Sequence, residues 1–194
     1  MHSITQEVLQ KHQASEIKAT EGHVLPDQMD FFVQFLLDHP EIKTVLEIGF
    51  NAGHSAATFL ATRPDINVIS IDLAAHDYVI PAKKWIDSLW PKRHLLIVGD
   101  SVQAMQVLHN FVPEFHPDLI FVDGGHDEPY PITDLRNALQ FASPSSWIIV
   151  DDTCAHMPAV LRAIEVTRKE FKFAPLYKAQ SGPYAAWIVG KKLG

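Results

Sequence analysis

Five short runs of apolar, largely β-branched residues recur along the chain, and longer segments with helical spacing separate them. The runs are nearly continuous in apolar residues, as expected for parallel strands that are buried on both faces of a sheet. They are KTVLEIG, INVISID, HLLIVGD, DLIFVD and SWIIVDD, which begin at Lys43, Ile66, His94, Asp118 and Ser146. The predicted helices are 26–40, 54–62, 79–90, 101–111, 129–141 and 157–170. This alternation predicts a doubly wound α/β sheet.

The C-terminal part follows a different pattern. Two apolar segments, 171–179 and 184–192, flank the short sequence QSGP, which predicts a β-hairpin. We therefore expect a mostly parallel sheet that is closed by an antiparallel hairpin, with helices on both faces. Without an internal repeat or a linker rich in proline and glycine, we expect one domain over 1–194, in which 1–40 form an N-terminal helical cap segment.

The composition narrows the classes of function. Hydrophobic residues make up 47% of the 194 residues, which is typical of a folded chain. The net charge of −7 argues against a nucleic-acid partner, because such partners select basic surfaces, and favours a small molecule or a metal ion. A single cysteine, Cys154, excludes an intramolecular disulfide. With neither an apolar run that could cross a bilayer nor a signal-like N-terminus, we expect no membrane partner and a cytoplasmic location.

Acidic residues stand at the carboxyl end of each predicted strand. In an open α/β sheet, ligands bind in the crevice outside these ends. One acid at such a position is more often the N-cap of the next helix than a ligand-binding residue. Acids after five successive strands instead predict a binding site along one edge of the sheet. The acids are Glu47, Asp72, Asp100, Asp123, Asp151 and Asp152.

The loop after the first predicted strand contains Gly49 and Gly53. Glycines permit close approach of the backbone to a ligand, and the helix from about His54 offers its N-terminal amides. The G-x-x-x-G spacing lacks the third glycine of a dinucleotide fingerprint, which weighs against a nicotinamide dehydrogenase. A purely structural role for the two glycines remains the alternative.

Asp72 follows the second predicted strand, where a carboxylate can accept hydrogen bonds from both hydroxyls of a ribose. This position favours a cofactor that contains a nucleoside, and the alternative is a cap for the next helix. Asp100 and Ser101 follow the third strand and fit either the edge of an adenine or the start of a helix.

Four motifs, VLEIGFNAGHSAATFL, VISIDL, IVGDS and DLIFVDGGH, resemble the successive motifs of class I S-adenosylmethionine-dependent methyltransferases. The resemblance extends from about residue 20 to the hairpin and implies a Rossmann-like, seven-stranded sheet. The segment 21–28, EGHVLPDQ, resembles the one that covers the methionine end of the cofactor. The resemblance implies S-adenosylmethionine binding by Glu47, Gly49, Asn51, Gly53, Ser55, Asp72, Leu73, Asp100, Ser101 and Asp123.

The motifs FVDGGH, Asp134-Leu135 and IIVDDT resemble a metal-dependent O-methyltransferase branch that includes sugar O-methyltransferases and relatives of cephalosporin hydroxylase. This resemblance implies that Asp123, Asp151 and Asp152 bind a divalent cation, with Mg²⁺ expected. Relatives often carry tyrosine two residues after the histidine, whereas this chain has Tyr130 four residues after His126. Several relatives also have glutamate in place of Asp151.

A hydroxyl is a poor nucleophile for methyl transfer until it loses its proton, and a chelated cation lowers that cost. We expect Asp123 and His126 to be catalytic, because His126 falls where some relatives place a base. Metal ligation and a structural role are the alternatives for His126. The expected partner is a small hydroxylated acceptor, and a homo-oligomer is possible. Rival hypotheses are metal-independent methyl transfer, hydroxylase-like chemistry and a non-catalytic binding module.

Overall fold

The structure is a computed structural model that describes residues 1–20, 22, 24–181 and 185–193. Its strands are β1 (Thr44–Ile48), β2 (Asn67–Asp72), β3 (His94–Val98), β4 (Leu119–Val122), β5 (Trp147–Val150), β6 (Phe173–Ser181) and β7 (Ala185–Lys192). Its helices are α1 (Ser3–Ala14), α2 (Pro26–Asp38), α3 (His54–Thr62), α4 (Val79–Leu89), α5 (Ser101–Phe111), α6 (Tyr130–Phe141) and α7 (Pro158–Glu170). The predicted helices and strands therefore form close to their predicted bounds.

The strands make one seven-stranded sheet in the order β3-β2-β1-β4-β5-β7-β6. Strands β1 to β5 are parallel, and β7 is antiparallel to both β5 and β6. This topology confirms the predicted doubly wound, mostly parallel sheet with its C-terminal hairpin. The predicted turn of the hairpin, QSGP, lies partly outside the described residues.

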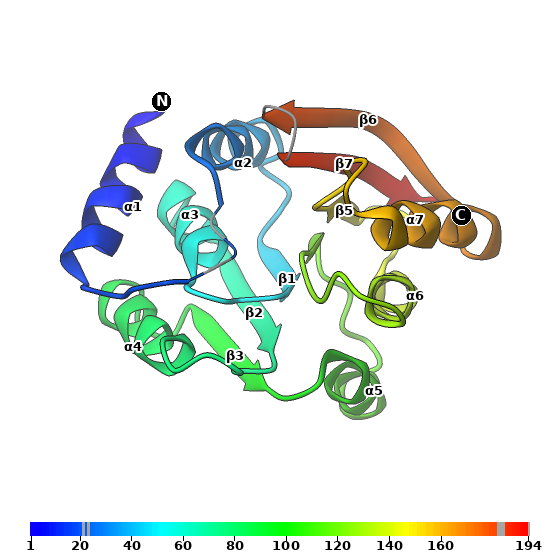
Figure 1. Ribbon diagram of the computed structural model, residues 1–194, viewed down its shortest axis with the longest axis horizontal. Helices are drawn as coiled ribbons and strands as arrows, with labels where there is room; N and C mark the ends of the chain where they lie inside the picture. Colours follow the sequence, from blue (N-terminus) through cyan, green and yellow to red (C-terminus); the bar gives the residue numbers. More distant parts are fainter. Residues whose placement is uncertain (21, 23, 182–184, 194) are drawn as a thin grey trace.

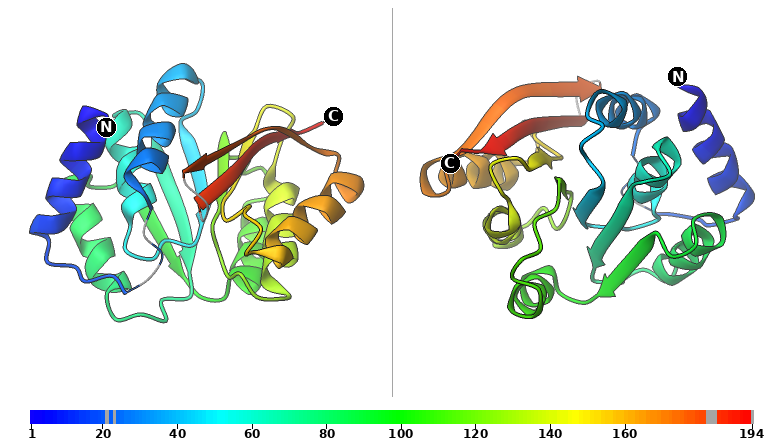
Figure 2. Two further views of the ribbon diagram at one scale, coloured as in Figure 1. Left: turned by 45° about the horizontal axis from the view of Figure 1, so that its top comes forward. Right: turned by 180° about the vertical axis from the view of Figure 1, so that it is seen from behind.

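Two apolar layers enclose the sheet. Successive side chains of a strand point to opposite faces, so Val45 and Phe121 pack with α1 to α4, whereas Leu46 and Ile120 pack with α5 to α7. Figure 1 shows these two groups of helices on either side of the sheet, and both views in Figure 2 agree. The continuous apolar runs of the sequence are thus explained by strands that are covered on both faces.

The two N-terminal helices belong to the first of these layers. Val8 of α1 and Met29 and Phe32 of α2 are fully buried against the same cluster as Phe59 of α3. The two helices that precede β1 therefore pack on the same face of the sheet as α3. Within the described residues, no helix is both long enough and apolar enough to cross a lipid bilayer.

A crevice forms between β1 and β4, where the chain reverses the order in which strands are added. The loops after these strands touch, because a Cβ atom at Gly49 would lie only 1.9 Å from the carbonyl oxygen of Asp123. Gly49 also has φ +92, a conformation that L side chains rarely adopt. Glycine at position 49 is therefore required for the close contact that shapes the crevice.

Candidate functional site

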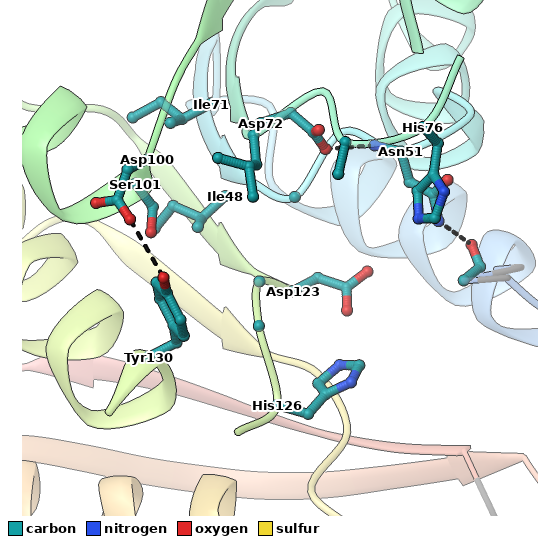
Figure 3. Close-up of a pocket in the computed structure, with 16 residues that line it drawn as sticks. Ile48, Asn51, Ile71, Asp72, His76, Asp100, Ser101, Asp123, His126 and Tyr130 are labelled. Atoms are coloured by element: carbon teal, nitrogen blue, oxygen red, sulfur yellow. Dashed lines mark hydrogen bonds between the residues drawn. The ribbon is translucent and has the colours of Figure 1, made fainter. Parts of the chain in front are cut away.

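A pocket of about 570 Å³ lies at the carboxyl ends of the parallel strands. Figure 3 shows the side chains from β1, β2 and the following loops that converge on it. Among the residues predicted to bind the cofactor, those that line the pocket are Gly49, Asn51, Asp72, Leu73, Asp100, Ser101 and Asp123. These residues come from four different strand ends, so the topology of the sheet brings them together.

Asp72 lies in the wall of this pocket and holds the loop that follows β1. Its Oδ2 accepts hydrogen bonds from the backbone N–H groups of Phe50 and Asn51, both at 2.8 Å. Its Oδ1 accepts a hydrogen bond from the N–H of Ala74 at 2.7 Å. A carboxylate has about four acceptor positions, so these bonds leave one for a ligand hydroxyl. Asp72 thus orders its own loop and still presents an acceptor to the pocket.

Asp100 combines the two alternatives that its sequence position left open. As the N-cap of α5, its Oδ1 accepts hydrogen bonds from the N–H groups of Val102 and Gln103 at 3.0 and 3.2 Å. The residue also lines the pocket, with Ser101 beside it. The helix cap fixes the carboxylate at the pocket wall, so capping and ligand binding are compatible here.

The hydroxyl of Ser101 is engaged away from the pocket. It donates a hydrogen bond to Oδ1 of Asp134 at 2.6 Å. Burial raises the pKa of Asp134 to about 6, and its Oδ2 would lie 2.6 Å from a Cβ atom at Gly124. Asp134 therefore connects α6 to the start of α5 and packs against Gly124 in the loop after β4. From the sequence it was expected only as part of a motif.

Glu47 lies behind the pocket instead of lining it. The alternation along β1 directs Glu47 toward α3, whereas Ile48 faces the pocket. Ser55 and Ser70 donate hydrogen bonds to its carboxylate, and burial raises the pKa of Glu47 to about 7. Gly53 and Ser55, also predicted to bind the cofactor, do not line the pocket either. Gly53 is the N-cap of α3 and donates to the carbonyl oxygen of Phe50 at 2.8 Å, and Ser55 connects α3 to Glu47.

Asp123 and His126 line the other end of the pocket, and together with Asp152, which lies just beyond the pocket lining, they form an acidic cluster. One potential ligand atom from each residue lies within 4.8 Å of the others. Nε2 of His126 is 2.5 Å from Oδ2 of Asp152, and this hydrogen bond raises the pKa of His126. Burial and the nearby carboxylates of Asp151 and Asp152 raise the pKa of Asp123 well above its usual value. Figure 3 shows Asp123 and His126 side by side.

Asp151, predicted as the third metal ligand, is outside this cluster. Its Oδ2 accepts a hydrogen bond from Nε2 of Gln28 on α2 at 2.6 Å, and its Oδ1 accepts one from the N–H of Asp152 at 2.8 Å. Asp152 has φ +53, so the backbone turns sharply between the two acids. Burial and the Asp152 carboxylate raise the pKa of Asp151 to about 6. The cluster thus contains His126, for which ligation was one of the alternatives, and does not contain Asp151.

The chemistry of the donors in this cluster fits a divalent cation. Mg²⁺ prefers carboxylate oxygens, and Mn²⁺ also accepts an imidazole nitrogen. Burial first, and then the neighbouring carboxylates, raise the pKa of Asp123, and a bound dication would offset both costs of the ionised form. Asp123, His126 and Asp152 are the residues that would hold the ion.

Some pocket residues were not predicted as site residues. Gly22 lines the pocket and belongs to the segment 21–28, part of which lies outside the described residues. His76 also lines it, and its ring stacks on Tyr78 with the centroids 5.0 Å apart. No motif marks the loop that carries His76. Tyr130 did have a signal, because its displacement from the family pattern was visible in the sequence.

Comparisons with known proteins identify the family of the chain. A family described as a methyltransferase domain matches residues 46–153, more than half of the chain. A comparison with curated proteins finds no match.

Several solved structures share the fold. An O-methyltransferase from Bacillus cereus in complex with SAH has a TM-score of 0.76 at 20% identity, over 99% of this chain and 92% of that chain. The O-methyltransferase TomG from Streptomyces achromogenes, involved in tomaymycin synthesis and in complex with SAM, has a TM-score of 0.73 at 16% identity, over 100% and 91%. The SAH-bound methyltransferase PaMTH1 from Podospora anserina has a TM-score of 0.75 at 15% identity, over 99% and 89%.

Proposed function

The chain belongs to the methyltransferase domain family and is an S-adenosylmethionine-dependent methyltransferase, and from this premise we propose that it methylates a hydroxyl of a small molecule with the help of a divalent cation. The observation that carries the proposal is the cluster of Asp123, His126 and Asp152 at one end of the pocket. The resemblance of these motifs to a metal-dependent O-methyltransferase branch supports the same reaction.

The nucleoside part of the cofactor would occupy the end of the pocket with Asp72 and Asp100. Asp72 keeps an acceptor position for a ribose hydroxyl, because backbone N–H groups hold its carboxylate in place. The tight glycine turn at Gly49 lets the backbone approach the ligand closely. This arrangement directs the methionine part of the cofactor toward Asp123.

Methyl transfer is a direct displacement, so the acceptor oxygen must align with the methyl carbon. When bound, the cation would act as a Lewis acid that lowers the pKa of the acceptor hydroxyl. His126 faces the pocket, with 44% of its side chain exposed, so an ion held by its imidazole would lie beside the acceptor hydroxyl. In this reaction Asp123, His126 and Asp152 would hold the ion, and a role for His126 as the base belongs to the metal-independent alternative.

A second function is favoured by one specific observation. The 2.5 Å contact between His126 and Asp152 is the arrangement of a base and its orienting carboxylate, which can remove a proton without a metal. This alternative is methyl transfer by His126 and Asp152 alone, on the same fold and with the same cofactor.

An assay of methyl transfer tests the proposal. The purified protein is incubated with S-adenosylmethionine and a panel of sugars and phenols, with Mg²⁺, with Mn²⁺ or with EDTA, and S-adenosylhomocysteine is measured. We expect turnover that EDTA abolishes and added cation restores. Turnover that is indifferent to EDTA would favour the metal-independent reaction. Cofactor binding without turnover on any acceptor would instead favour a binding module.

We propose a cytoplasmic location for this reaction. The chain carries one cysteine, Cys154, which is buried and free. A chain without a disulfide is compatible with a reducing compartment.

A further inference from the structure

Tyr130 lines the pocket at the end where Asp100 and Ser101 lie. It is the first residue of α6, and its hydroxyl donates a hydrogen bond to Oδ2 of Asp100 at 3.3 Å. Figure 3 shows the ring reaching from α6 toward Asp100 and Ser101, with Ile48 and Ile71 farther along the same side of the opening. The side chain of Tyr130 therefore joins α6 to the N-cap of α5 at the wall of the pocket.

The loop after β4 leaves room for this ring. A Cβ atom at Gly125 would lie 3.2 Å from both Cβ and Cγ of Tyr130, which is closer than ordinary van der Waals contact. A side chain at position 125 would require the tyrosine or the loop to shift by a few tenths of an ångström. The glycine and the tyrosine thus form one unit, and the unit places an aromatic face in the lining of the pocket.

The polar groups near this ring define what the pocket end can recognise. Oδ1 of Asp100 is occupied by the N–H groups of Val102 and Gln103. The hydroxyl hydrogen of Ser101 is directed to Asp134. Oδ2 of Asp100 accepts the 3.3 Å bond from Tyr130, which is long for a hydroxyl donor, and it has further acceptor capacity. A carboxylate oxygen that faces the pocket selects a ligand group that donates hydrogen bonds.

An aromatic ring beside one such acceptor suits a flat base with an exocyclic amine. Bases stack on aromatic side chains, and a carboxylate accepts from an amine but repels a carbonyl oxygen. We propose that Tyr130 is a cofactor-binding residue whose ring stacks on the adenine and whose hydroxyl orients Asp100 toward the exocyclic amine. Tyr130 would thereby determine the preference of the pocket for adenine. The proposal rests on the cofactor of the family, and it does not depend on the cation or on the acceptor.

Calorimetric titrations of the full chain with two ligands test this proposal. The ligands are S-adenosylhomocysteine and S-inosylhomocysteine, in which a carbonyl replaces the exocyclic amine. The variants are Tyr130→Phe and Tyr130→Ala, and the matched control is Tyr177→Ala, a half-exposed tyrosine on β6 that does not line the pocket. Circular dichroism and the Tm of each variant establish that it is folded.

For the wild type we expect binding that is at least about tenfold tighter for the adenosyl ligand, since the unpaired carboxylate rejects the carbonyl. Tyr130→Ala should weaken the binding of both ligands by about tenfold through loss of stacking. Tyr130→Phe keeps the ring and should lower the preference between the ligands to about threefold. A merely structural tyrosine would change the Tm without changing this preference.

Two results with the variants would overturn the proposal, and one with the wild type would do so too. One is a dissociation constant of Tyr130→Ala within twofold of the wild type, and the other is an unchanged preference in Tyr130→Phe. A wild type that does not bind S-adenosylhomocysteine would overturn it as well. Failure of the acceptor assay or indifference to EDTA would contradict only the proposed O-methylation, because neither the ring nor Asp100 takes part in that step.

Discussion

The carboxylates at the two ends of the pocket differ in their hydrogen-bond partners. At the nucleoside end, which comprises Asp72 and Asp100, backbone N–H groups donate to each side chain. These bonds fix the carboxylates and offset the cost of placing them at the sheet edge. At this end the fold itself supplies the partners of the acids.

The acidic end comprises Asp123, which lines the pocket, and the adjacent Asp151 and Asp152. Gln28 and His126 are the side-chain partners of Asp151 and Asp152, and burial together with the neighbouring carboxylates raises the pKa values of Asp123 and Asp151. Among the described residues, one backbone N–H, that of Asp152, donates to these carboxylates, whereas five such bonds reach the two carboxylates of the nucleoside end. From this difference we infer that one end suits a neutral nucleoside and that the other would attract positive charge.

The largest effect should come from the acidic end. Asp123→Asn removes one charge from the proposed cation site, and we expect kcat to fall by about 10²- to 10³-fold. The acceptor assay measures this change. Asp127→Asn, a matched control at an exposed neighbouring acid, should retain activity within about twofold. Equal activity of Asp123→Asn and the wild type would remove the distinction between the two ends.

The buried carboxylate of Glu47, which lies behind the nucleoside end, should make the free energy of unfolding depend on pH. The pKa of Glu47 is about 7 in the folded chain and ordinarily 4.5, so the folded state holds the proton between these values. The free energy of unfolding should therefore fall as the pH rises from 4.5 to 7, by about 3 kcal/mol at 1.36 kcal/mol per unit. Glu47→Gln stays neutral and should lack this loss.

Urea titrations from pH 4.5 to 8 measure the difference between Glu47→Gln and the wild type. His94, whose pKa burial lowers to about 4, is present in both proteins and cancels in the difference. Glu114→Gln changes an exposed glutamate and is the control. A difference that is constant across this pH range would contradict the raised pKa of Glu47.

The nucleoside end should affect the cofactor and not the cation. Asp72→Asn places an amide where three backbone N–H groups donate, so the loop after β1 loses part of its support. We expect the dissociation constant of S-adenosylhomocysteine to rise by about tenfold with unchanged affinity for cations. Calorimetry checks both, with the exposed Asp77→Asn as control. A parallel loss of cation affinity would show that the two ends are not independent.

The smallest effect should come from Gln28, which holds Asp151 away from the cluster. Gln28→Leu removes the amide donor and leaves Asp151 free to turn toward a cation. We expect the affinity for Mn²⁺ at pH 8 to increase, on the order of threefold. The control is Gln34→Leu on the exposed face of α2. Weaker binding in Gln28→Leu would instead make Gln28 a support for a ligand, with Asp151 inside the coordination set.

The fold could be predicted in detail because each strand has its own local signal. Strands that are buried on both faces have continuous apolar runs, and DLIFVD and SWIIVDD both show this pattern. The sequence also placed Asp72 and Asp100 at the pocket wall, since a strand end determines the position of the next residue. The prediction that Glu47 binds the cofactor did not foresee that its side chain points away from the pocket. Successive residues of a strand point to opposite faces, so Ile48 faces the pocket and Glu47 does not.

The composition of the acidic end was harder to predict, because it depends on contacts between distant segments. Gln28 and Asp151 are 123 positions apart, and neither residue marks the other in the sequence. Asp152 has a left-handed backbone conformation, which the sequence does not indicate because the residue is not a glycine. Similarly, the bond between Tyr130 and Asp100 follows from the packing of α6 beside α5, which no local pattern specifies.

Titration of Mn²⁺ into the protein saturated with S-adenosylhomocysteine tests the central claim that a cation site adjoins the cofactor pocket. For the wild type the account predicts one bound ion per chain. For Asp152→Asn it predicts no measurable ion, while the affinity for S-adenosylhomocysteine stays within about threefold. Equal Mn²⁺ binding by the wild type and Asp152→Asn, or none by either, would contradict the account.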